Sequence, residues 1–159
     1  MNFQKIVARL KRCCESKSVR TLKDMKSQYN EQKEVKRILQ KRNPIIYRVY
    51  VKQLSENVLI GLTVMNSGKV GKEYYMTKGH KHKKPYPEKY ILIKGKAKLV
   101  LQDKTSKTIL LKKNKPFTVP GKSAHRLVNI GKDKLEVLAI YDKRAGHDYK
   151  TKFKKRVCE

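Results

Sequence analysis

Tryptophan is absent from this chain, and cysteine is scarce, with three residues at positions 13, 14 and 158. Cys13 and Cys14 are adjacent and Cys158 lies at the opposite end, so no C-x-x-C spacing exists to hold zinc. An odd number of cysteines at the two ends of a chain is typical of free thiols in a reducing compartment.

Long hydrophobic runs are also missing. No stretch of the sequence approaches the roughly 18 apolar residues that a membrane-spanning helix requires. The first residues, Met1–Lys5, form no continuous apolar segment of the kind found in secretory signals. The sequence therefore predicts a cytoplasmic protein without a membrane partner. Its 159 residues fit one domain.

Acidic residues are few, 13 against 41 basic residues, which gives a formal net charge of +28. Such a charge raises the hypothesis of a nucleic-acid-binding module. However, 32 of the basic residues are lysines spread over the whole chain, and only nine are arginines, the residues preferred for bidentate phosphate contacts. No recognition motif accompanies the charge. We therefore expect nucleic acid to bind only non-specifically.

The spacing of apolar residues divides the chain at Pro44. Before it, residues 3–14 and 31–42 have helical periodicity, with Asn30 as the cap of the second helix and Asn43-Pro44 as its end. After it, the period changes to two, and short strands alternate with turn signals, which indicates a β-sandwich or barrel. The expected strands are Ile46–Val51, Val58–Met65, Val70–Thr77, Lys89–Lys94, Lys98–Gln102, Thr108–Lys112, Phe117–Val119, Arg126–Asn129 and Leu135–Tyr141.

Four histidines carry the chemistry that the sequence suggests: His80, His82, His125 and His147. Residues two apart in an extended segment face the same side, so His80 and His82 can present two imidazoles to one point. Glu88 opens the next strand, and His125 precedes a later strand that can face it. Three imidazoles and one carboxylate suit a divalent transition metal such as iron, manganese, nickel, cobalt or zinc.

These residues belong to a longer pattern. Gly79-His80-Lys81-His82 is followed by Glu88 and Gly95, and Pro120-Gly121 is followed by His125 and Asn129. Together the two halves resemble the two cupin motifs. This resemblance implies an all-β fold, the cupin double-stranded β-helix or jelly-roll barrel, with a short helical N-terminal region. We expect residues 1–44 to form an arm packing on the barrel, residues 45–150 the barrel, and residues 151–159 a basic, loosely ordered tail.

Three stretches resemble one subfamily, the archaeal cupin-type glucose-6-phosphate isomerases. They are Gly68–His80, His125–Gly131 and Leu138–Tyr149, the last of which contains Ala145-Gly146-His147-Asp148-Tyr149. The likeness covers roughly residues 18–150. One departure is Pro120–Ser123, which replaces an aromatic-bearing stretch and predicts a smaller, more polar pocket wall.

The resemblance implies an enzyme that interconverts glucose 6-phosphate and fructose 6-phosphate with one divalent metal, iron(II) first among the candidates. It further implies a homodimer. By the same resemblance, the metal ligands are His80, His82, Glu88 and His125; the catalytic residues are Glu88, His147 and Tyr149; and the substrate contacts are Thr63, Thr77, Gly79, Tyr90 and Tyr141. The alternatives are isomerisation of a related sugar phosphate such as mannose 6-phosphate, or a cupin that binds a sugar phosphate or another anion without catalysis.

Overall fold

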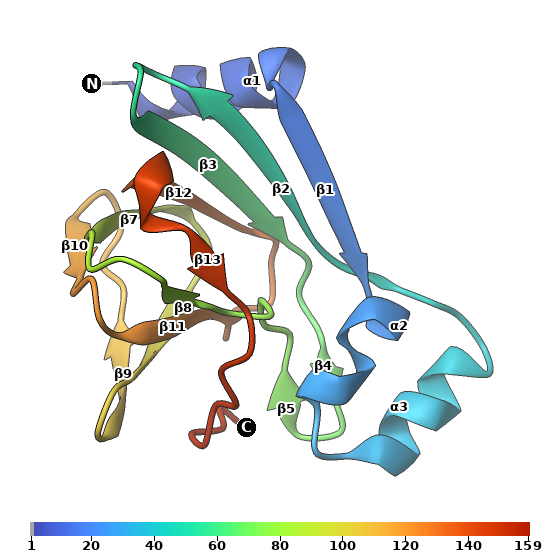
Figure 1. Ribbon diagram of the computed structural model, residues 1–159. Helices are drawn as coiled ribbons and strands as arrows, with labels where there is room; N and C mark the ends of the chain where they lie inside the picture. Colours follow the sequence, from blue (N-terminus) through green and yellow to red (C-terminus); the bar gives the residue numbers. More distant parts are fainter. Residues whose placement is uncertain (1) are drawn as a thin grey trace.

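The protein is built from two facing β-sheets, as a computed structural model that describes residues 2–159 shows (Figure 1). The larger sheet is antiparallel and has six strands. In spatial order they are β1 (Ser16–Thr21), β2 (Ile45–Gln53), β3 (Val58–Met65), β12 (Leu135–Asp142), β7 (Glu88–Lys94) and β10 (Pro116–Val119).

Shorter elements complete the barrel opposite this sheet. A three-stranded sheet contains β11 (Ala124–Asn129), β8 (Ala97–Gln102) and β9 (Ser106–Leu110). Two-stranded pairs are formed by β13 (His147–Asp148) with β6 (Lys81–His82), and by β4 (Lys69–Val70) with β5 (Glu73–Tyr74). The main core lies between the sheets, because buried Tyr90 and Leu92 from the larger sheet share one cluster with Leu99 and Leu127 from the smaller one.

The larger sheet is apolar on both faces, and the alternation along β3 shows why. Ile60, Leu62 and Val64 point to the outer face, where they pack against α1 (Phe3–Cys13), whereas the next residue along the strand, Met65, belongs to the inner core. Because successive strand residues point to opposite faces, one apolar strand serves both layers. The helix contributes Val7 and Leu10 at helical spacing, as the sequence predicts.

The N-terminal region contains more regular structure than the sequence predicts. Strand β1 pairs with β2 at the edge of the larger sheet and is followed by α2 (Leu22–Met25) and a 3-10 turn, Lys26–Gln28. The second predicted helix is present as α3 (Gln32–Leu39), although its N-cap is Glu31 rather than Asn30. Residues 22, 25, 29 and 35 are buried in the main core, so this region packs on the barrel.

Two further expectations need correction. The predicted strand Val70–Thr77 is the hairpin of β4 and β5, which turns at Gly71 with a φ of 57°. The C-terminal tail is not loosely ordered. Phe153 is buried in the main core, and the amide of Tyr74 donates a hydrogen bond of 3.2 Å to the carbonyl of Val157. Apolar residues within a basic segment anchor it.

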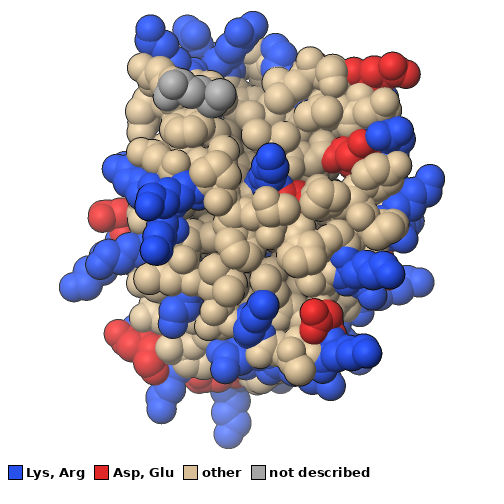
Figure 2. Space-filling view, turned by 90° about the vertical axis from the view of Figure 1, so that its left-hand side faces the viewer, with Lys and Arg blue, Asp and Glu red and all other residues tan. Residues whose placement is uncertain are grey.

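Lys and Arg side chains project mainly around the edge of the face drawn in Figure 2, with few acidic groups among them, and most of its centre is formed by other residues. They form no single stripe on this face. Within residues 2–159, none of the helices has both the length and the apolar character needed to cross a bilayer.

Candidate metal centre and substrate cavity

Gly79 allows the segment that carries His80 to approach β11 closely. Its φ is +74°, and a Cβ at this position would lie 2.7 Å from the carbonyl oxygen of His125. Only glycine therefore fits there without displacing the backbone. The following residue, His80, exchanges two backbone hydrogen bonds of 3.0 and 2.9 Å with His125. This pairing brings the two halves of the motif side by side.

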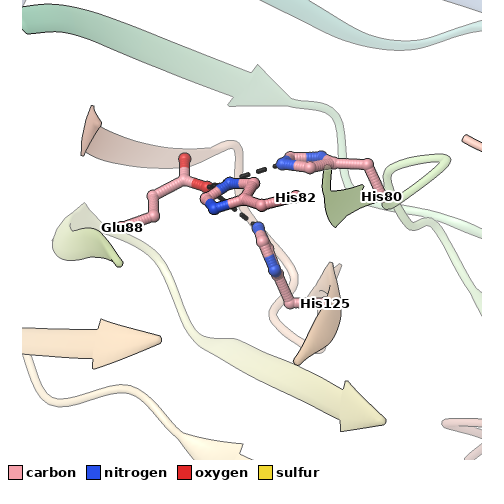
Figure 3. A group of neighbouring side chains, drawn as sticks. All are labelled: His80, His82, Glu88 and His125. Atoms are coloured by element: carbon pink, nitrogen blue, oxygen red, sulfur yellow. Dashed lines mark hydrogen bonds and ion pairs between the residues drawn. The ribbon is translucent and has the colours of Figure 1, made fainter. Parts of the chain in front are cut away.

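Four side chains converge inside the barrel, as Figure 3 shows. Glu88 lies at the start of β7, and its Oε2 is 3.5 Å from Nε2 of His80, 3.2 Å from Nε2 of His82 and 2.9 Å from Nε2 of His125. The ligand atoms of all four lie within 4.8 Å of one another. The second oxygen of Glu88 points away from the imidazoles (Figure 3).

Backbone carbonyls fix the orientation of two of the imidazole rings. Nδ1 of His82 lies 2.5 Å from the carbonyl oxygen of Tyr86, and Nδ1 of His125 lies 3.1 Å from that of Ser123. A carbonyl oxygen only accepts, so each Nδ1 carries the hydrogen and each Nε2 of a neutral ring presents a lone pair. Such a hydrogen bond is typical of histidines that bind metals through Nε2.

The cluster requires a positive charge at its centre. Nε2 lone pairs directed at a carboxylate oxygen repel it unless a cation or a proton lies between them. Nε2 of His80 is buried and has no hydrogen-bond partner among the described residues. The donor set of three imidazoles and one carboxylate therefore fits a divalent transition metal.

The pKa values of these residues also indicate that the cluster needs a positive charge at its centre. Burial raises the pKa of Glu88, but its contacts with His125, His80 and His82 outweigh burial and hold the pKa well below its ordinary value. Burial lowers the pKa of His82, but Glu88 and the Tyr86 carbonyl reverse this and raise it. Burial dominates at His80 and lowers its pKa. Glu88 is thus ionised, and the stabilisation of its charge requires a proton or a cation between its oxygen and the imidazole rings.

A cavity of about 120 Å³ adjoins the cluster. All the residues expected from the sequence to contact substrate line it, together with His80, Glu88, His147 and Tyr149. His82 and His125 lie behind this wall, 5% and 1% exposed. The expected substrate contacts that line this cavity are Thr63, Thr77, Gly79, Tyr90 and Tyr141.

His147 forms one side of the cavity through the pairing of β13 with β6, which places it opposite His82. Its Nδ1 lies 3.2 Å from the hydroxyl of Tyr149. Burial and, to a smaller extent, the neighbouring ring of His80 together lower the pKa of His147 to about 4. The imidazole is therefore neutral near pH 7, with one nitrogen able to accept a proton and the other able to donate one.

Four lining residues were not expected from the sequence: Tyr47, Val49, Gly61 and Ala139. Tyr47 accepts a hydrogen bond of 3.3 Å from the amide of Lys78, and burial raises its pKa, so it presents a neutral hydroxyl. The alternation of β2 could have placed Tyr47 and Val49 on one face of the strand. Nothing in the sequence shows which of the two faces lines the cavity.

The expected polar wall at residues 120–123 is wrong, because these residues do not line the described cavity. Gly121 instead packs under the loop before Glu88, where a Cβ would lie 2.3 Å from the carbonyl of Pro85. Ser123 is buried and accepts the hydrogen bond from His125. This segment supports the histidine rather than forming the pocket.

The sequence is also similar to known proteins of one family. Residues 19–158 match the family described as glucose-6-phosphate isomerase (GPI). The chain belongs to this family. The glucose-6-phosphate isomerase of Pyrococcus furiosus is 40% identical over 141 residues, which cover 85% of this chain and 75% of that protein. The enzyme of Thermococcus litoralis is 37% identical over 141 residues, 85% of this chain and 74% of its own.

Solved structures with the same fold include more distant proteins. An oxalate decarboxylase of Lactobacillus farciminis in a formate complex superposes with a TM-score of 0.53 at 17% identity, covering 64% of this chain and 30% of that one. An oxalate oxidase in complex with glycolate gives 0.52 at 14% identity, covering 64% and 55%. These likenesses establish the cupin barrel for this member of the glucose-6-phosphate isomerase family, but not its chemistry.

Proposed function

We propose that the protein is a metal-dependent isomerase that interconverts glucose 6-phosphate and fructose 6-phosphate. The observation that supports this most strongly is the cluster of three imidazoles around Glu88, which opens on a cavity lined by hydroxyl groups and His147. Membership of the glucose-6-phosphate isomerase family points to the same reaction.

In this proposal His80, His82, Glu88 and His125 hold one divalent metal, with iron(II) the first candidate and manganese, nickel, cobalt and zinc the alternatives. The ion supplies Lewis acidity that stabilises negative charge developing on the substrate oxygens. The chain's contribution is to keep the site dry, since three of the four ligands are at most 5% exposed.

Proton transfer is assigned to the cavity side chains. The oxygen of Glu88 that points away from the imidazoles takes the proton from C2 of the aldose and returns it to C1, through a cis-enediol. Neutral His147 moves the proton from O2 to O1, which completes the conversion to the ketose without a net gain or loss of protons. Tyr149 holds His147 in place through their contact of 3.2 Å.

The remaining contacts are assigned to substrate binding. Thr77 already accepts a hydrogen bond of 3.0 Å from the amide of Leu127, which leaves its hydroxyl hydrogen free to donate to a phosphate oxygen. Thr63 and the backbone at Gly79 add small polar groups at the same wall. Tyr90 and Tyr141 supply amphipathic surfaces suited to a sugar ring.

The proposal extends to a cytoplasmic homodimer that binds nucleic acid only non-specifically. Strands β1, β10 and β9 are outer strands of their sheets, and Leu110 on β9 is 60% exposed. Exposed edges of this kind invite pairing with a second copy. On the face drawn in Figure 2, the basic side chains form no single stripe of the kind that would track a nucleic-acid backbone.

The test is an assay that couples glucose 6-phosphate formation from fructose 6-phosphate to a dehydrogenase. We expect activity that a chelator abolishes and a single returned metal restores. An inactive, metal-replete protein would refute catalysis and favour the alternative, a cupin that only binds sugar phosphates. A parallel assay with mannose 6-phosphate as the substrate tests the related isomerisation. The metal dependence should be the same in both assays, so only the preferred substrate distinguishes the two activities.

A further inference from the structure

A second cavity, of about 460 Å³, lies between the C-terminal tail, the Lys26–Gln28 turn and β11. Nine described residues line it, and four of them are basic while none is acidic. The basic residues are Arg126, Lys150, Lys152 and Arg156. Hydroxyl groups of Ser27 and Thr151 lie among them. The lining is thus a set of hydrogen-bond donors with a concentrated positive charge.

Arg126 is the buried part of this lining, with 2% of its surface exposed. Its guanidinium lies 4.4 Å from the centre of the Phe153 ring. Nη2 donates to the side chain of Gln28 and to the carbonyl of Lys78, both of which are neutral acceptors. Its Nε is buried without a partner among the described residues.

No carboxylate of the described chain lies within ion-pair distance of Arg126. Glu73 is the acid that partly balances it, but this side chain is already engaged elsewhere. It accepts hydrogen bonds from the amides of Asn30 and Glu31, at 2.7 and 3.3 Å, and lies 3.4 Å from Arg156. One carboxylate therefore stands against two guanidinium groups. Burying a cation without a full counter-charge is costly, and a bound anion removes that cost.

We infer that this cavity binds a phosphate-type anion, at a site separate from the substrate cavity. Guanidinium groups and hydroxyls are the donors that recognise phosphate, and the volume leaves room for an organic body attached to it. The ligand is either free phosphate or a small phosphomonoester, which share the recognised group. Tyr149 lines both cavities, so the two sites share one side chain.

The experiment is calorimetric titration of the full-length, metal-loaded protein with inorganic phosphate and with adenosine 5′-monophosphate, at about 0.15 M salt. We expect saturable binding at the second cavity that persists when the substrate cavity is altered. The double variant K150Q/K152Q removes two lining charges and should weaken binding by about tenfold. The matched control K154Q/K155Q removes two exposed charges that do not line the cavity and should leave the affinity unchanged.

A second pair of variants separates the two cavities. Thr63→Val alters only the substrate cavity and should not change phosphate binding, whereas Arg126→Met should abolish it. If Arg126→Met does not fold, the comparison of K150Q/K152Q with K154Q/K155Q still shows whether phosphate binds in the second cavity. Equal losses in both lysine pairs, or a loss in Thr63→Val alone, would overturn the inference. Tighter binding of the nucleotide identifies a phosphomonoester as the ligand, and equal binding identifies free phosphate; both support the site.

Discussion

The ring of His147 packs against that of His80 in a tilted arrangement, with ring centroids 3.9 Å apart and ring planes inclined by 30°. The two residues are 67 positions apart in the sequence, and the pairing of β13 with β6 brings them together. One ring belongs to the proposed metal ligands, and the other faces the cavity and Tyr149. The contact therefore joins the metal centre to the group that we assign to proton transfer.

Replacing His147 by phenylalanine keeps an aromatic ring against His80 but removes both nitrogens. We expect kcat to fall by about 10²-fold or more, the usual worth of a general acid–base group, while the metal content stays at one ion per chain. Steady-state kinetics with metal analysis of the same sample checks this. Unchanged kcat would exclude His147 from proton transfer, and loss of metal would show that it acts by supporting His80.

Glu88→Gln retains the shape of the side chain but removes its charge. We expect weaker metal binding and a loss of activity of at least about 10²-fold, because a neutral amide neither neutralises the ion nor accepts the substrate proton. The matched control is Glu136→Gln, which alters another buried carboxylate, paired with Lys11 on the outer face of the sheet. Metal retention should distinguish the two variants. Equal retention would contradict the assigned ligand set.

Gly79→Ala tests the close approach of the segment that carries His80 to the strand that carries His125. A methyl group would meet the His125 carbonyl, and φ is +74°, so we expect a loss of stability of about 2 kcal/mol or more together with loss of activity. Gly61→Ala is the control, since its Cβ meets nothing closer than 3.8 Å. That variant should fold as stably as the parent. Urea denaturation of both proteins measures the difference.

The metal centre was the most predictable part of the molecule, and the reason is physical. Two histidines two residues apart on a strand must share a face, and a short loop limits how far Glu88 can lie from them. Strand β1 was not predictable, because its sequence, Ser16–Thr21, is mostly polar and shows no apolar alternation. The backbone hydrogen bonds that pair it with β2 are not visible in the sequence. Phe153 was missed because isolated apolar residues in a basic tail show no periodic pattern.

The same limit applies to the second cavity. Arg126 follows the metal ligand His125 directly, and in the sequence it is only one more basic residue. Its burial depends on the tail folding back so that Phe153 covers the guanidinium. Arg126 lies on β11 and Phe153 lies in the tail, so no sequence periodicity links the two residues, and their contact is seen only in the three-dimensional structure.

The stability of the fold should decline above about pH 10, the ordinary pKa of tyrosine. Tyr29 is 2% exposed, and burial raises its pKa, so the native state keeps this proton while the unfolded chain loses it. Each pH unit above 10 then costs up to about 1.4 kcal/mol of unfolding free energy for each such residue. Tyr29→Phe should flatten the decline, because the variant lacks this proton. Denaturation at pH 9, 10 and 11 provides the comparison, and equal slopes for the variant and the parent would contradict it.

Isomerisation in D₂O tests the assigned route of the proton. Transfer through Glu88 places the proton on an exchangeable oxygen between its removal from C2 and its return to C1, so deuterium should enter the product. Glu88 is only 2% exposed, which slows exchange, and we therefore expect less than one deuterium per turnover. Tyr149 at the cavity is 49% exposed, so exchange is slowed rather than prevented. Mass spectrometry of fructose 6-phosphate after many turnovers measures the label. A product without any deuterium would mean that hydrogen passes directly between the carbons as hydride, and Glu88 would then act only as a metal ligand.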